Sequence, residues 1–300
     1  MRAASMLRTL TLPLVALLLT GLAHAADKPQ RIVSTTPSVT GILLAINAPV
    51  IATAAAAPSR LTDAKGFFRQ WAEVADQRAV QVLYPNLQFD LEAVIGWAPD
   101  LLVVSATGAD SVLQHQAELE AQGINSAVVN YSNHSWQEMA VELGKVTGLE
   151  QQAQDAIQRF DAYTLKVASG LTPPPGTVSV VGYNIAGSYS VGLPASPQAR
   201  LLSALGFTVA GLPDALKDQV RRSSDVGFIS RENLSRAIAG DSVFLLGGSE
   251  ADVQAFLADP VLANLPAVRN KQVYPLGVSS FRIDYYSGKQ MIDTVARSFP

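Results

Sequence analysis

Short apolar runs alternate with longer amphipathic segments along most of the chain. The runs at 31–34, 49–54 and 101–105 have the length of strands, and "LLVVS" at 101–105 is continuously apolar up to Ser105, as a buried parallel strand requires. Other segments, such as "SVTGILLAINA" and "SWQEMAVELGKVTG", place their apolar residues at helical spacing. Because strands that alternate with helices build βαβ units, we expect an α/β fold.

Residues 149–170 break this alternation. The segment "LEQQAQDAIQRFDAYTLKVASG" contains neither proline nor glycine before Gly170, and a helix of about 20 residues is roughly 30 Å long. The prolines of "LTPPPG" end it, since proline cannot continue a helix. We therefore predict two Rossmann-like lobes, 26–148 and 171–300, joined by this single long rigid helix. One continuous doubly wound domain is the alternative.

A weak internal repeat favours two lobes. The segments 89–105 and 229–247 each contain a helix start with a glutamate near its first turn, an apolar face, a turn with aspartate and a buried strand. Glu92 and Glu232 occupy matching places. An acid in the first turn stabilises the helix dipole. Two exposed acids on corresponding faces could also dock a pseudo-symmetric basic partner.

The first 25 residues have the features of a secretory signal peptide. Arg2 and Arg8 precede the short apolar run "TLTLPLVALLLTGL", which ends at the cleavage-like triplet "AHA". A membrane anchor is the alternative, but the run is short for a bilayer span. The chain contains no cysteine, which excludes disulfides and a lipid-modified N-terminal cysteine. We expect a mature chain without an integral membrane segment, free in the periplasm.

The charge and the histidines narrow the functional classes. The net charge is −3, and loss of Arg2 and Arg8 with the signal peptide makes it more negative, which argues against a nucleic-acid partner. His115 and His134 are the only histidines after the signal peptide, too few for a transition-metal site without cysteine. The segment "SYSVG" approaches a hydrolase elbow, but no histidine follows it. A hydrolase therefore stays an alternative, and we expect no enzyme.

Candidate binding residues cluster where predicted strands end, which is where open α/β sheets bind ligands. Arginine and aromatic side chains at such places suit a planar anionic ligand, because guanidinium groups supply charge and donors while rings supply stacking surface. Arg221 and Arg222 lie in "DQVRRSSD", before a further strand-like run. The predicted ligand-binding residues are Arg60, Tyr189, Arg221, Arg222, Phe281 and Arg282.

Several segments together resemble a known family. "PQRIVS", "GFFRQW", "SATGADS", "LPAVRNKQVYPLG" and "FRIDYYS" are similar to segments of the periplasmic substrate-binding proteins of iron–siderophore ABC importers, and especially of the members that carry ferric enterobactin. The resemblance extends over essentially the whole chain from Pro29. It implies the helical-backbone, class III fold of that family, in which a rigid helix bridges two lobes that close only slightly.

The resemblance also implies a function. Such a protein binds a ferric catecholate siderophore in the interlobe cleft and delivers it to an inner-membrane ABC permease, with iron present only inside the chelate and no cofactor of its own. Arg60, Phe281 and Arg282 match positions near the ligand, and Glu92 and Glu232 match the permease-docking positions. A tryptophan of the relatives is replaced near Gly192, so the choice of catecholate stays open. Alternatives are another iron chelate, such as a hydroxamate, or haem.

Overall fold

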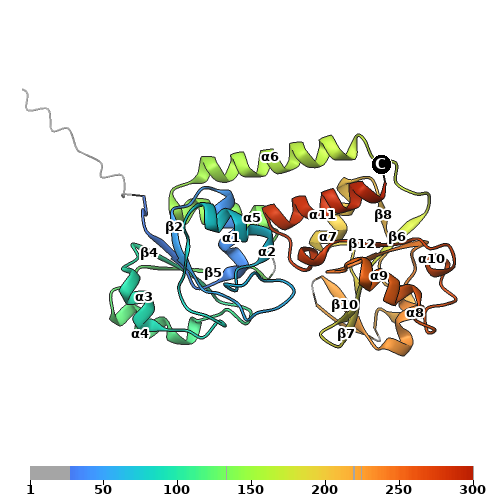
Figure 1. Cartoon of the computed structure of the whole chain (residues 1–300), viewed down its shortest axis with the longest axis horizontal. Coiled ribbons are helices and arrows are strands. Elements are labelled where there is room, and N and C mark those ends of the chain that lie inside the picture. The colour runs from blue at the N-terminus through green and yellow to red at the C-terminus, as the bar shows by residue number, and fades with distance from the viewer. Residues whose placement is uncertain (1–27, 133, 219, 224, 300) are drawn as a thin grey trace, which may run out of the picture.

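The computed structural model describes residues 28–299 except 133, 219 and 224, so the predicted signal peptide lies outside the described residues. Two lobes, each built on one sheet, lie side by side, and one long helix runs across both of them with a second helix beside it (Figure 1). No helix in the described part of the chain has the length and apolar character needed to span a bilayer.

The first lobe contains a five-stranded sheet in the order β3-β2-β1-β4-β5, and every pairing is parallel. All five residues of β4 are buried, as its apolar run predicts. The strands are β1 Ile32–Ser34, β2 Val50–Thr53, β3 Gln81–Val82, β4 Leu101–Ser105 and β5 Ser126–Val129. The helices are α1 Pro37–Ala45, α2 Arg69–Gln77, α3 Leu91–Trp97, η1 Leu113–His115, α4 Gln116–Ala121 and α5 Trp136–Thr147.

The second lobe has a seven-stranded mixed sheet in the order β12-β11-β6-β7-β10-β9, with β8 also paired to β6. Its strands are β6 Thr177–Ile185, β7 Ser188–Gly192, β8 Thr208–Val209, β9 Arg221–Arg222, β10 Val226–Ile229, β11 Ser242–Leu245 and β12 Val273–Pro275. Its helices are α7 Pro197–Ala204, η2 Asp214–Leu216, η3 Arg231–Asn233, α8 Leu234–Ala237, α9 Glu250–Leu257, α10 Pro266–Arg269, η4 Val278–Phe281 and α11 Tyr285–Ser298.

Half of this second sheet departs from the βαβ pattern. The strands β7, β10 and β9 pair antiparallel, and β6 turns directly into β7. Asn184, Ala186 and Gly187 have positive φ angles in that turn, which lets the chain reverse within a few residues. The sequence pattern did not predict this hairpin.

The connecting helix α6 spans Glu150–Ala168, so it begins and ends within two residues of the predicted segment. Its buried residues, Ala153, Ala156, Phe160 and Thr164, form a stripe along one face. This helix packs on α5 of the first lobe and on α7 of the second. The predicted α/β fold class is confirmed, and α6 is the long helix that the sequence predicts between the two sheets.

A second helix also links the lobes. The C-terminal helix α11 runs beside α6 and packs on α1 and α2 of the first lobe as well as on β12 of the second (Figure 1). The approach is close at Gly41, where an added Cβ would lie 2.6 Å from both Asp284 and Trp71. The predicted second lobe, residues 171–300, includes α11. In the structure, however, α11 also packs on the first lobe.

Candidate ligand-binding site

A cavity of about 860 Å³ lies between the lobes, within the range of volumes that small-molecule sites occupy. Both lobes contribute to its wall, and polar and aromatic side chains stand among the apolar ones. The first lobe supplies Ser38, Ile42, Tyr131, Ser132, His134, Trp136 and Met139. The rest of the chain supplies Ile185, Ala186, Ser188, Ser190, Ala195, Pro197, Gln198, Arg200, Ser223, Asp225, Val226, Phe228, Leu246, Phe281, Arg282 and Ile283.

Arg282 lines this cavity, at the end of the loop that follows β12. Its carbonyl oxygen accepts a hydrogen bond of 2.7 Å from the Ser287 hydroxyl, which fixes the backbone at the start of α11. Its guanidinium lies 4.3 Å from the centre of the Tyr131 ring, a cation–π contact across the two lobes. Among the described residues the Arg282 side chain forms no ion pair, so its donors are available to a ligand.

Tyr131 is the platform on which Arg282 rests. Its hydroxyl donates a hydrogen bond of 2.5 Å to Asp110 Oδ1. Burial, together with that hydrogen bond, raises the pKa of the Tyr131 phenol to about 12, and nearby Arg282 opposes the shift. Tyr131 is therefore a neutral phenol near pH 7, and the face of its ring is available to the cation.

Phe281 extends an exposed ring into the same cavity, with 47% of its surface accessible. Its loop is held from two sides. Gln198 Nε2 donates to the carbonyl oxygens of Ser280 and Phe281 at 2.8 and 3.2 Å, and the Gly247 N–H donates to the Ser280 hydroxyl at 2.9 Å. An apolar ring that the backbone holds open to solvent is suited to stacking on a ligand ring.

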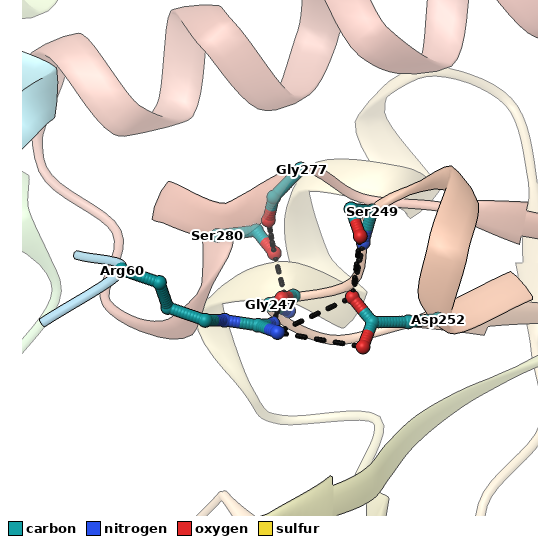
Figure 2. Close-up of polar contacts among 6 residues, drawn as sticks. All are labelled: Arg60, Gly247, Ser249, Asp252, Gly277 and Ser280. Atoms are coloured by element: carbon teal, nitrogen blue, oxygen red, sulfur yellow. Dashed lines mark hydrogen bonds and ion pairs between the residues drawn. The ribbon is translucent and has the colours of Figure 1, made fainter. Parts of the chain in front are cut away.

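The Arg60 side chain contacts Asp252 and Gly247, as Figure 2 shows. Its Nη1 is 3.3 Å from Asp252 Oδ2, and its Nη2 donates to the carbonyl oxygen of Gly247. Both partners belong to the second lobe, so Arg60 bridges the lobes and is not among the residues that line the cavity. Gly247 also lies next to Phe281. A Cβ added at Gly247 would be 3.9 Å from Arg60 Nη2 and 3.9 Å from Phe281 Cβ.

Two other predicted contacts, Tyr189 and Arg221, are not among the residues that line the cavity. The Tyr189 ring packs edge-on against Tyr183 at 5.5 Å and does not line the cavity. Arg221 lies 4.4 Å over the Phe228 ring, and Phe228 itself is part of the wall. Arg222 is in β9, and its side chain lies outside the described part of the structure.

Several residues of the wall were not predicted from the sequence. Tyr131 is the last residue of the strand-like run "NSAVVNY", so the strand-end rule could have found it. Trp136 opens α5, and Arg200 lies within α7, where no strand-end signal exists. Arg200 adds a second guanidinium to the cavity, while Asp225 adds a carboxylate.

The two glutamates with a predicted docking role are both exposed. Glu92 lies in the first turn of α3, whose N-terminus Asp90 caps through the Ala93 N–H at 3.0 Å. Glu232 lies in η3, where its own backbone N–H and the Ser230 hydroxyl hold its pKa below the ordinary value. The neighbouring Arg231 pairs with Asp259 at 2.8 Å, so Glu232 faces solvent as a net negative charge.

The hydrolase-like segment lacks the structural context of a nucleophile elbow. "SYSVG" forms β7, which pairs antiparallel with β6 and β10. An elbow instead requires a sharp turn from a strand into a helix. In the described part of the chain, no three histidine, aspartate or glutamate side chains gather as a possible metal site.

The comparison with known families identifies the chain. A family model described as periplasmic binding protein matches residues 32–278. The chain belongs to this periplasmic binding protein family. Its sequence is 42% identical over 278 residues to the ferric enterobactin-binding periplasmic protein FepB of Escherichia coli, a match that covers 91% of this chain and 86% of FepB. The family predicted from the sequence is thereby confirmed.

Solved structures superpose on most of the chain. Holo-ViuP matches with a TM-score of 0.80 and 39% identity, over 91% of this chain and 90% of that one. Staphylococcus aureus SirA complexed with staphyloferrin B matches with a TM-score of 0.67 and 18% identity, over 92% and 95% of the two chains. At that lower identity the likeness concerns the fold alone.

Proposed function

We propose that this protein is a periplasmic receptor for a ferric catecholate siderophore of the enterobactin type. The observation that carries the proposal is the cavity between the lobes, where the Arg282 guanidinium forms no ion pair with a described residue and lies beside exposed aromatic surface. The relative FepB, whose name states ferric enterobactin binding, supports the ligand class. The family supports the periplasmic location, and we propose that residues 1–25 direct export and are removed.

Binding in this cavity requires no bond to be made or broken. Arg282 and Arg200 would neutralise the anionic chelate, because guanidinium groups donate charge-assisted hydrogen bonds to anionic oxygens. Phe281 would stack on a catechol ring. The iron stays inside the siderophore as part of the cargo, so the protein itself needs no cofactor.

The remaining predicted contacts need a rearrangement before they reach the ligand. Arg60 joins the ligand if its guanidinium leaves Asp252, since it already adjoins Gly247 at the same edge as Phe281. Arg221 acts through the Phe228 ring on which it lies. Tyr189 reaches the ligand if its ring leaves Tyr183, and Arg222 adds charge near β9.

The decisive experiment is a fluorescence titration of the mature protein. Trp136 lines the cavity, so a ligand that enters will quench its emission. We expect saturable quenching by ferric enterobactin and much weaker quenching by a neutral ferric hydroxamate, which gains little from two arginines. Equal or tighter binding of the hydroxamate or of haem would replace the catecholate with that ligand. Recovery of cleaved siderophore after incubation would indicate a hydrolase.

Delivery to an inner-membrane ABC permease is proposed to use Glu92 and Glu232. Both are exposed first-turn acids of corresponding segments, and Arg231 is engaged by Asp259. We expect that replacing both glutamates with alanine abolishes siderophore uptake by cells while the affinity of the purified protein stays unchanged. An equal loss of affinity would contradict a docking role. Replacement of exposed Glu118, on α4, serves as the matched control.

A further inference from the structure

Asp110 is a buried carboxylate close to the cavity but not part of its wall. Only 5% of its surface is accessible. It accepts hydrogen bonds from Tyr131 Oη at 2.5 Å, from Thr36 Oγ1 at 2.6 Å and from the Ser38 N–H at 3.3 Å. No cation pairs directly with it among the described residues. A carboxylate buried in this way needs its donors held in place, so the cluster is rigid.

Gly108 shows how closely the chain fits around this cluster. A Cβ added at Gly108 would lie 1.7 Å from the Tyr131 hydroxyl oxygen and 2.9 Å from Asp110 Oδ1. Its φ of +83° is also a conformation that favours glycine. The backbone therefore passes directly against the phenol, and the hydrogen bond to Asp110 leaves the Tyr131 ring little freedom to turn.

The fixed ring in turn holds Arg282. The guanidinium lies 4.3 Å from the ring centre, and it comes from the segment after β12, whereas Tyr131 follows β5 in the other lobe. A phenol that donates to a carboxylate carries more electron density in its ring, which strengthens the attraction of the ring face for a cation. A polar cluster of the first lobe thus sets the place of a cation that belongs to the second.

We propose that Asp110 is a positioning residue for ligand binding: it fixes Tyr131, and the Tyr131 ring presents the Arg282 guanidinium to an anionic ligand. The ring holds the guanidinium through a cation–π contact, which leaves its N–H donors free. A carboxylate would instead accept hydrogen bonds from those donors. The ligand can then take the guanidinium without breaking an ion pair. This inference rests on the proposed function in one respect, namely that the ligand is an anion.

The first test uses the ligand-free protein. Protons above an aromatic ring resonate upfield, so the Arg282 side-chain signals, assigned by their loss in Arg282→Gln, report the contact directly. We expect Tyr131→Leu to abolish the upfield shift and Asp110→Asn to reduce it. The matched control is Asp259→Asn, which removes the charge from another buried aspartate that accepts from a tyrosine hydroxyl. Unchanged Arg282 signals in folded Asp110→Asn would overturn the proposal.

The second test is a double-mutant cycle with ferric enterobactin. We expect Asp110→Asn to weaken binding about 3- to 10-fold, the range of a cation–π contact, and to have no further effect in Arg282→Gln. An equal loss in both backgrounds would mean that Asp110 does not act through Arg282. If Asp110→Asn does not fold, Tyr131→Phe tests the same hydrogen bond, because it removes only the hydroxyl that donates to Asp110. Unchanged Arg282 shifts and unchanged affinity in Tyr131→Phe would contradict the proposal.

The two tests separate this inference from the ligand assignment. If the Arg282 shifts respond as expected but ferric enterobactin does not bind, the positioning role of Asp110 holds and the proposed ligand is wrong. If ferric enterobactin binds but the shifts and the cycle show no coupling, the proposed function holds and the positioning role is wrong.

Discussion

The protein contains two groups of aspartate, tyrosine and arginine that differ in one contact. In the cleft group, Tyr131 donates to Asp110 at 2.5 Å and Arg282 lies on the Tyr131 ring. In the lobe group, Tyr183 donates to Asp259 at 2.8 Å, but Arg231 pairs directly with the carboxylate at 2.8 Å. Burial and the hydrogen bond raise the pKa of both tyrosines to about 12.

The difference decides what each arginine can do. Arg231 has its charge neutralised by Asp259, and it serves the structure of the second lobe. Arg282 lies on the Tyr131 ring and forms no ion pair with a described residue, so its donors remain available. The position of an arginine in the sequence therefore does not indicate a ligand contact until its acidic neighbours in space are known.

The largest contrast is expected when the two arginines are replaced. Arg282→Gln should weaken binding of ferric enterobactin about 10- to 100-fold, because hydrogen bonds to charged groups contribute about 1.5–3 kcal/mol. Arg231→Gln should leave the affinity unchanged. Quenching of Trp136 measures both. A comparable loss in the two variants would remove the distinction between the groups.

The lobe group should contribute to the loss of stability in acid. Burial opposes ionisation of Asp259, but hydrogen bonds from Tyr183, the Val261 N–H and Arg231 outweigh it and hold the pKa of Asp259 below its ordinary value of 3.8. Such a group stabilises the fold fully above its unfolded pKa, and the contribution is lost as the pH falls through the folded pKa.

Asp259→Asn should therefore lower the free energy of unfolding at pH 7 by about 1–2 kcal/mol. The loss is smaller than for a fully buried ion pair, because 45% of the Arg231 side chain is accessible to solvent. The loss should shrink as the pH falls below 3.8 and vanish at pH values below the folded pKa of Asp259. Urea denaturation of both proteins at pH 7 and at low pH measures this, and a pH-independent loss would contradict it.

Removal of one hydroxyl from each group gives a smaller and sharper contrast. Tyr131→Phe and Tyr183→Phe each break one hydrogen bond to a buried aspartate, so each should cost about 1 kcal/mol of stability. Only Tyr131→Phe should also weaken ligand binding, by about 2- to 5-fold, since its ring holds Arg282 less firmly. Thermal melts and titrations report the two quantities. A change of affinity in Tyr183→Phe would contradict the expectation.

The smallest effect is expected at Arg60. This arginine lies near the cleft, but it pairs with an aspartate, as Arg231 does in the lobe group. Its side chain is 54% accessible, so Asp252→Asn should change stability by less than about 1 kcal/mol. If the freed Arg60 joins the ligand as proposed, affinity should rise by up to about threefold. Asp63→Asn is the control, because Asp63 forms no ion pair in the described part of the chain. A lower affinity in Asp252→Asn would contradict the ligand role of Arg60.

The sequence predicted the features that depend on local pattern. The strand and helix alternation of the first lobe, the segment 149–170 and the place of Arg282 after the strand "KQVYPLG" follow from periodicity and strand ends. The resemblance to a family supplied the ligand class. The antiparallel half of the second sheet was not predicted, because a strand that turns back looks in sequence like a strand that ends.

Contacts between distant segments could not be predicted from one sequence. Arg60 carries the same strand-end signal as Arg282, but its partner Asp252 is 192 positions away. Tyr131 and Arg282 meet only because α11 packs on the first lobe and brings the preceding loop with it. Spacing along the chain contains no information about either pairing.

The two helices that cross both lobes have a thermodynamic consequence. The helices α6 and α11 run side by side (Figure 1), pack on each other and each contact both lobes, so they hold the two walls of the cavity in a fixed relation. Little conformational entropy then has to be lost on association, and more of the contact energy is available as affinity. Such a receptor binds its ligand in a preorganised cavity rather than by folding around it.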